Sequence, residues 1–456
     1  MVSSLKKISS KYNNLSRRQI KNELNSQIWF TPLLYSIGAI ILVFLTLSAD
    51  YSLLLGEKVP DFFSVSFELT NTLISTLMPA ILTLTAFTFN LVLVAFATFS
   101  GQFSPRVLKN FTTSKTTQRI LGIFNGSFLF TLIIYFFLSG EQVGAYFAIP
   151  VMATFLAGLC AGIFVHFINH SVKWMQVNNM TQKMKKDSKT SILLSLRDEL
   201  EPYRHTNYSR AQQEIPVSEP FYIKAPHSGY IQIVDFIKLV KYAKKDHIIV
   251  KLECDIGDHV LKGAPLLSYW PEENQQIDEK LYLSAYFIGS TQTDIQDIRF
   301  NLSKFVEIAI RSLGNFDTKT ASNAIFQISD LLRVICEVTK FMPFLMDEKG
   351  NLRVILIKYD FSDYLYYSYS SIRHHARDNV SITIELLKAL TTLSQSVDET
   401  YKTDIWNFAL YIVNGFNKDY LFSHDKRCFY EALENLAITT DHQESFNDDV
   451  KIHGLE

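Results

Sequence analysis

Residues 72–99 read TLISTLMPAILTLTAFTFNLVLVAFATF, a run of 28 residues without a single Asp, Glu, Lys or Arg. A helix needs about 20 mainly apolar residues to cross the hydrocarbon core of a bilayer, so this stretch predicts a transmembrane helix. It is longer than one crossing requires, and we expect it to tilt or to extend into water. Similar runs occupy residues 29–48, 120–138 and 146–168. The sequence therefore predicts a membrane domain of four transmembrane helices over residues 29–180.

The rest of the chain has a different composition, because most of its charged residues lie after about residue 180. In total, 44 Lys and Arg oppose 45 Asp and Glu, which gives a net charge of -1 over 456 residues. This balance shows no basic excess for a polyanion, so we expect no nucleic-acid partner. The four cysteines are scattered singly, a pattern typical of a reducing compartment rather than of a zinc site or a disulfide framework.

The loops between the predicted spans indicate an orientation, because loops rich in Lys and Arg stay in the cytoplasm. Cations precede the first span, separate the second from the third and follow the fourth: Lys6, Lys7, Lys11, Arg17, Arg18, Lys21, Arg106, Lys109, Lys115, Arg119, Lys173, Lys183, Lys185 and Lys186. The other two loops are mainly acidic, with Lys58 as their only cation. We therefore expect residues 1–28 to form a basic cytoplasmic segment, both termini to be cytoplasmic and the part after the fourth span to be cytosolic.

A polar stripe runs along the second span. A turn of 100° per residue places Thr76, Thr83 and Asn90 on one face of a helix, seven residues apart. One interpretation is a seam at which helices pack through small and polar residues. The other is a hydrated pathway, since an Asn inside a membrane must find a partner or water.

Spans three and four carry glycines at four-residue steps, which allow another helix to approach closely. Span three contains Gly122 and Gly126, and span four contains Gly158 and Gly162, followed by His166 and His170. The two histidines could pack through hydrogen bonds, sense pH or contribute to a metal site. A zinc site would need a third ligand, and none is close in sequence.

The loop after span two ends in a basic turn. Pro105 favours an extended Ser104, which is then a suitable N-cap for a new helix. We expect an ordered helical cytoplasmic loop here, whose cations could hold lipid phosphates. Its polar residues form a loop motif made of Gln102, Ser104, Arg106 and Arg119.

The chain resembles the predicted bacterial membrane proteins known as domain of unknown function 2254. The resemblance rests on residues 93–95, 102–106, 118–122, 167–170 and 228–232 and on Gln296-Asp297. The chain departs from the family pattern at Gln292, where Arg is expected, and at Phe316-Asp317-Thr318, where Asn-Asp-Pro is usual. The resemblance implies a multi-pass topology in the bacterial inner membrane, but no established activity.

We predict a mixed α+β architecture for the cytosolic part. Residues 181–220 are expected to be a linker, with an amphipathic helix over 191–200, and residues 221–290 a small β-rich module. Residues 257–266 are similar to the hammerhead turn of biotinyl and lipoyl domains, but the modified lysine of those domains has no counterpart, which favours a structural role. Residues 291–440 show the periodicity of a helical bundle, and residues 441–456 are expected to be a flexible tail.

Two local features interrupt this helical part. Residues 342–346 and 352–358 flank a turn containing Gly350, which predicts a β-hairpin. Gln296 and Asp297 precede a helical pattern that begins at residue 298, so they could cap that helix, or they could bind a ligand.

No P-loop, dinucleotide-binding, zinc-protease or nucleophile-elbow motif occurs in a suitable context. We therefore predict neither an enzyme nor a cofactor. The leading hypothesis is a homo-oligomeric, channel-like protein in contact with membrane lipid, in which spans two and four line a path for a small ion. The alternative is a membrane-anchored sensor or scaffold whose spans only oligomerise.

Overall fold

The computed structural model describes residues 29–102, 115–138, 144–175, 177–204, 208–271 and 276–452. The chain divides into two compact units, Met1–Asn179 and Met180–Glu456.

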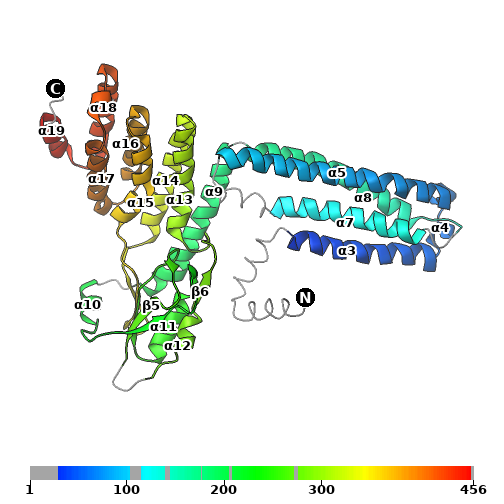
Figure 1. Cartoon of the computed structure of the whole chain (residues 1–456), viewed down its shortest axis with the longest axis horizontal. Coiled ribbons are helices and arrows are strands. Elements are labelled where there is room, and N and C mark those ends of the chain that lie inside the picture. The colour runs from blue at the N-terminus through cyan, green and yellow to red at the C-terminus, as the bar shows by residue number, and fades with distance from the viewer. Residues whose placement is uncertain are drawn as a thin grey trace. The chain divides into compact units, whose positions relative to one another are not determined.

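The first unit contains four long helices that are apolar enough to cross a membrane (Figure 1). They are α3 (Phe30–Leu47), α5 (Phe67–Gln102), α7 (Lys115–Leu138) and α8 (Ala148–Met175). The four apolar helices predicted from the sequence are thus confirmed. Both α5 and α8 extend beyond the predicted bounds, because hydropathy marks the part of a helix that suits lipid and not its hydrogen-bonded ends.

Helix α7 is the central helix of this unit. It packs against α3, α5 and α8. In its apolar 18-residue stretch 50% is buried, against 17–22% in the corresponding stretches of the other three helices. The core includes Val43, Ile74, Phe130, Ile134 and Ile149. Many large apolar side chains of α3, α5 and α8 point outward instead, as in Phe44, Leu93 and Phe155, which suits a surface covered by lipid tails.

A buried carboxylate connects the turn after α3 with the beginning of α8. Asp50 lies in a π-helical turn, Ser48–Ser52, that follows α3, and its side chain is fully buried. Its Oδ1 accepts hydrogen bonds from the backbone N–H of Phe147 (3.1 Å) and Ala148 (2.9 Å), and its Oδ2 accepts one from Ile149 (2.9 Å). These donors belong to the first turn of α8, so Asp50 caps a helix that lies far away in sequence.

The second unit contains two β-sheets (Figure 1). A five-stranded sheet has the order β1-β5-β3-β8-β7, and a three-stranded sheet has the order β4-β2-β6. The strands are β1 (Phe221–Lys224), β2 (Gly229–Val234), β3 (Ile249–Leu252), β4 (His259–Val260), β5 (Pro265–Trp270), β6 (Tyr286–Gly289), β7 (Phe344–Met346) and β8 (Leu352–Ile355). Two helices accompany them, α11 (Phe236–Lys245) and α12 (Glu279–Leu283).

The predicted hairpin is present as β7 and β8, with Gly350 at φ +80° in its turn. It is not an isolated interruption of the helices, however. Strand β8 pairs in parallel with β3, where Val250 lies opposite Val354. The larger sheet therefore extends past the predicted β-rich module of residues 221–290. Local periodicity could not reveal this, because pairing between distant strands depends on tertiary contacts.

The remaining helices of this unit pack in two layers. They are α13 (Ile298–Gly314), α14 (Thr318–Val338), α15 (Phe361–Ala376), α16 (Val380–Ser394), α17 (Lys402–Asn414) and α18 (Ser423–Thr439). Helix α15 contacts α13 and α17, while α16 contacts α14 and α18. The predicted helical part is confirmed. Helix α15 lies within these residues although its Tyr-rich and Ser-rich sequence has only modest helix propensity.

The boundary segments differ from the predictions. Residues 181–220, expected to be a linker, include most of α9 (Val177–Ile192), a π-helix (Leu193–Leu200) and the short α10 (Tyr208–Gln213). Their side chains Met184, Ile192 and Leu196 are buried, so the first half of this segment is a packed part of the second unit. The predicted tail contains α19 (Gln443–Ile452), and Ser445 accepts a hydrogen bond from the indole of Trp406 (3.3 Å).

Candidate functional site

The polar stripe of α5 lies on the outer surface of the first unit. Thr76, Thr83 and Asn90 are all exposed, whereas Ile74 and Ile81 face the interior. The hydroxyls of Thr76 and Thr83 donate to backbone carbonyls one turn earlier, both at 2.8 Å. The stripe therefore lines no path inside the described part of a single chain. No described residue of the first unit covers it.

Asn90 differs from the two threonines of the stripe. A threonine in a helix can satisfy its hydroxyl on its own backbone, as Thr76 and Thr83 do. The amide of Asn90 has two donors and an acceptor, and it is exposed within the apolar run of α5. Contact with lipid would leave these groups unsatisfied, which is costly. Asn90 is thus the residue of the stripe that most requires a partner.

The two glycine pairs are used differently. A Cβ on Gly122 would lie 2.6 Å from the ring of Tyr35, and one on Gly126 would lie 3.1 Å from the carbonyl oxygen of Tyr35, so both glycines let α3 pack closely on α7. In contrast, a Cβ on Gly158 or Gly162 would meet nothing within 4 Å. The glycines of α8 therefore leave open space on its surface, where another helix could approach.

His166 and His170 stack on each other at the end of α8, with ring centroids 6.5 Å apart and planes 9° from parallel. His166 is exposed and His170 is partly exposed. Among the described residues, no group of three or more His, Cys, Asp or Glu could hold a metal ion. The pair continues the open glycine face of α8, so a ligand or protein that covers these glycines would also meet His166.

The loop motif is only partly described. Gln102 is the last residue of α5, and Arg119 is exposed in the first turns of α7, while Ser104 and Arg106 lie outside the described residues. Beside Arg119, the buried Gln118 accepts a hydrogen bond from the Thr31 hydroxyl at 2.7 Å. This contact ties α7 to the start of α3, a pairing of residues 87 positions apart that the sequence alone does not reveal.

In the second unit, Gln296 does not cap the helix that follows it. Its amide pairs with the backbone of Val234 in both directions, because Oε1 accepts from the N–H (2.9 Å) and Nε2 donates to the carbonyl (3.0 Å). Nε2 also donates to Glu199 at 2.8 Å. Gln296 therefore joins the end of β2 to the π-helix over Leu193–Leu200. The sequence showed its place before α13 but not this distant partner.

Asp297 is the N-cap of α13, as one of the two alternatives predicted, and its Oδ1 accepts a hydrogen bond from the N–H of Phe300 at 2.8 Å. Its carboxyl group is buried against Gly257. Burial raises the pKa of this carboxyl to about 6, although the hydrogen bond from Phe300 and the nearby Arg299 favour the ionised form. The cap is thus an acid that titrates closer to neutral pH than an ordinary Asp.

A buried polar cluster joins α9 to the loop before α13. The Ser191 hydroxyl lies 2.6 Å from the carbonyl of Asp294 and 2.9 Å from that of Ile295. Lys304, only 4% exposed, binds the Asp294 carboxylate at 2.5 Å, and the Asn301 amide donates to the Asp294 carbonyl at 2.9 Å. In the chain, α9 follows α8. The cluster therefore fixes α9, the first helix of the second unit, to the loop before α13.

Arg299 connects three parts of the second unit. Its guanidinium donates to the Ile256 carbonyl (2.8 Å), to Asp258 (2.9 Å) and to the Tyr359 hydroxyl (3.0 Å). It also lies over the rings of Tyr359 and Tyr367. Because most of its donors are engaged, this arginine is better suited to fixing the turn over residues 256–258 on α13 than to binding a ligand.

The raised pKa of Asp297 predicts a pH-dependent effect of its substitution. Folding raises the pKa of the Asp297 carboxyl from 3.8 to about 6, so the folded protein binds this proton more tightly than the unfolded chain does. The bound proton therefore stabilises the fold below about pH 4, and this stabilisation is lost as the pH rises to about 6. Asn also caps helices well but does not titrate. We expect Asp297→Asn to be more stable than the wild type at pH 7.5 by an amount on the order of 2 kcal/mol, and to lose this advantage near pH 4.5. Thermal unfolding of the purified protein across this range measures the difference.

Asp317 provides the control for this experiment. It caps α14 in the same way, through a 3.0 Å hydrogen bond from Thr320, but at an exposed position. The Asp317→Asn protein should differ from the wild type by a small amount. A stability difference for Asp297→Asn that did not change with pH would contradict the prediction.

Comparison with known proteins supports the assignment of the chain to a family. The family model described as "Predicted membrane protein (DUF2254)" matches residues 25–392. Uncharacterized proteins of Mycobacterium tuberculosis (strain CDC 1551 / Oshkosh) and Mycobacterium bovis (strain ATCC BAA-935 / AF2122/97) are 26% identical over 352 residues. The match covers 74% of this chain and 66% of each relative, so the chain spans about two thirds of their length. No solved structure matches.

The family model covers all four apolar helices, both β-sheets and the helices as far as α16. The chain therefore belongs to the DUF2254 family of predicted membrane proteins.

Proposed function

We propose that this protein forms a homo-oligomer in the bacterial inner membrane and that the α5 stripes of several subunits line a shared polar path for a small ion. In this proposal both termini and the second unit are cytoplasmic. The second unit regulates the path, and the turn over residues 257–266 is a hammerhead-like structural element. The observation that carries the proposal is the exposure of Asn90, together with Thr76 and Thr83, on the outside of a single chain.

Two features support assembly. Water or another subunit that covers Asn90 would give its amide hydrogen-bond partners. The open space beside Gly158 and Gly162 offers a place where a neighbouring helix can approach closely. Helices α5 and α8 are in contact with each other, so a neighbouring subunit could meet both of them. Four spans in one chain seldom enclose a pathway, whereas identical subunits around an axis can do so.

A second candidate is a sensor or scaffold in which the stripe forms a dry seam between subunits. The observation in its favour is that Thr76 and Thr83 already satisfy their hydroxyls on their own helix. Such residues pack well between helices without water. The two candidates thus share the oligomer and differ in whether water reaches Asn90.

Replacing Asn90 tests the proposal. Asn90→Leu removes the amide and makes the stripe apolar, so we expect potassium flux into reconstituted vesicles to fall by about tenfold or more, because partial dewetting of a narrow path raises its barrier. Asn90→Gln retains the amide and serves as the matched control with near-normal flux. Light scattering in detergent gives the oligomeric state of each variant.

The possible results separate the two candidates. Unchanged flux and a raised unfolding temperature for Asn90→Leu would favour the dry seam. A monomer in detergent and in vesicles would contradict both.

A further inference from the structure

The connection between α3 and α5 exposes two adjacent phenylalanines. It contains α4 (Leu55–Lys58) and a 3-10 turn (Asp61–Phe63), and α4 lies at the end of the first unit where α3 ends and α5 begins (Figure 1). Phe62 is 89% exposed and Phe63 is 51% exposed. Their rings meet edge to face, with centroids 5.2 Å apart. The two side chains, here called the aromatic pair, therefore form one apolar surface.

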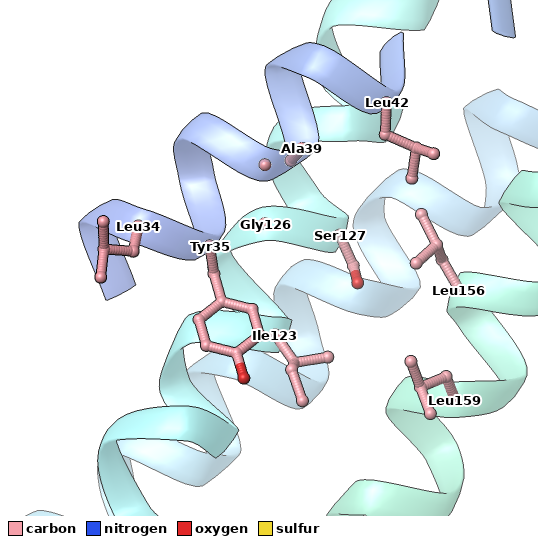
Figure 2. Close-up of a pocket in the computed structure, with 10 residues that line it drawn as sticks. Leu34, Tyr35, Ala39, Leu42, Ile123, Gly126, Ser127, Leu156 and Leu159 are labelled. Carbon is pink, nitrogen blue, oxygen red and sulfur yellow. The ribbon is translucent and has the colours of Figure 1, made fainter. Parts of the chain in front are cut away.

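Exposed apolar side chains within the apolar helices need no special partner. The groove between α3, α7 and α8 is an example, in which Leu34, Leu156 and Leu159 border open space (Figure 2). Lipid tails can cover such a surface wherever the helices cross the membrane. Phe62 and Phe63 lie outside the four apolar helices. In water, their rings would keep a large apolar surface hydrated, which is unfavourable, so their exposure needs another explanation.

The loop that carries the aromatic pair is fixed on both sides of it. Before the pair, Gly56 packs directly on the segment that precedes α8, because a Cβ at Gly56 would collide with the carbonyl oxygen of Ala145. After the pair, Val65 and Tyr146 exchange two backbone hydrogen bonds, of 2.9 and 2.8 Å. The loop therefore presents the two rings outward from a backbone that is held in place.

Two neighbours of the aromatic pair define its level along the spans. The ring of Phe63 lies 6.3 Å from that of Phe147, edge to face, and Phe147 directly precedes the apolar helix Ala148–Lys173. Phe67, the first residue of α5, follows Phe63 by only four residues, which span at most about 14 Å. Both spans thus begin beside the pair. This is the level of the lipid headgroups, a zone that extends roughly 5–7 Å beyond the hydrocarbon core on each side.

We propose that the loop between α3 and α5 lies on the bilayer surface and inserts Phe62 and Phe63 at the boundary between lipid headgroups and acyl chains. Large apolar side chains beside polar ones are the residues that bind this boundary. Lipid surrounds the spans at this level whether or not the protein assembles, so the proposal does not depend on the oligomer or on the polar stripe of α5. Through the ring of Phe147, the inserted pair holds the beginning of α8 at the bilayer surface.

Tryptophan fluorescence of the full-length protein in vesicles tests the proposal. Phe62→Trp keeps an aromatic ring at this position, and the wild type with its four tryptophans supplies the background. The vesicles contain phosphatidylethanolamine and phosphatidylglycerol, and part of the lipid carries bromine either just below the glycerol or near the chain ends. We expect bromine below the glycerol to quench the added tryptophan about twofold more than bromine near the chain ends. Acrylamide in the water should quench it less than free tryptophan.

The matched control is Phe155→Trp. Phe155 is 62% exposed and lies seven residues inside the apolar helix that begins at Ala148, a depth of about 10 Å. Its tryptophan should be quenched more strongly by bromine near the chain ends, the reverse of the order expected for Phe62→Trp. Phe63→Trp is a second variant of the pair and should repeat the pattern of Phe62→Trp.

Two results would overturn the proposal. Strong quenching by acrylamide without quenching by brominated lipid would place the aromatic pair in water. Protection from both quenchers would place it against protein, such as a neighbouring subunit. Unfolding temperatures equal to that of the wild type show that each variant is folded when it is measured.

Discussion

Asp50→Ala is expected to destabilise the first unit by about 3 kcal/mol or more, because each buried donor that loses its partner costs about 1–3 kcal/mol. The carboxylate accepts three backbone hydrogen bonds from the first turn of α8, one of them buried and two part-buried, and alanine would take the acceptor away from all three donors. A negative charge at a helix N-terminus also favours the helix dipole. Thermal unfolding in detergent should show a drop in midpoint of roughly 10 °C.

Two further variants serve as controls for Asp50→Ala. Asp50→Asn retains one acceptor oxygen but turns an NH₂ group toward the donors, so it should fall between the wild type and alanine. Glu57→Ala removes an exposed acid from the same loop and should change the midpoint by no more than a surface substitution does, about 0.5 kcal/mol. A midpoint for Asp50→Ala equal to that of Glu57→Ala would refute the capping role of Asp50.

Asp50 also shows where sequence reasoning reaches its limit. The apolar runs predicted the four helices, because length and hydropathy are local properties of the chain. The acids between spans one and two served only to orient the topology. The partners of Asp50 lie 97 to 99 residues away, and no spacing in the sequence connects them. A buried acid in a loop therefore looks the same in sequence as an exposed one such as Glu57.

The polar stripe illustrates the same limit in another form. The helical period correctly places Thr76, Thr83 and Asn90 on one face of α5, since the angle per residue is fixed. It does not say whether that face looks inward or outward, which depends on how α7 and α8 pack on the opposite side. The structure supplies this direction, and an outward face is what a homo-oligomeric channel with its path between subunits requires.

Gln296 and Asp297 show which contacts depend on neighbouring residues in the sequence and which depend on distant ones. Capping by Asp297 follows from one residue type at one position before an amphipathic pattern, so the sequence could suggest it. The pairing of Gln296 with Val234 bridges 62 residues and resembles a strand contact made by a side chain. Likewise, the sequence identified the β7–β8 hairpin through its turn, but not the pairing of β8 with β3.

Gly257→Ala is expected to produce the second large effect, a loss of about 3 kcal/mol from the second unit. Gly257 has φ +89°, and a Cβ there would lie 2.0 Å from the Asp297 carboxylate. Alanine would therefore bear both the strain of a left-handed backbone, about 1–2 kcal/mol, and the displacement of the cap of α13, about 1 kcal/mol. Gly263→Ala is the control, because Gly263 has φ +87° with nothing within 4 Å of a Cβ. The control should lose only the backbone term.

The difference between these two variants isolates the contact between Gly257 and Asp297. If that contact causes the extra loss of stability, a shorter side chain at position 297 should reduce the loss. Serine is a good N-cap with a smaller side chain, so Asp297→Ser should cost less in the Gly257→Ala background than in the wild type, a non-additivity of about 1 kcal/mol. Denaturation midpoints of the four proteins measure this coupling. Equal losses for Gly257→Ala and Gly263→Ala, with additive double variants, would mean that backbone strain alone acts and that the turn does not rest on the cap of α13.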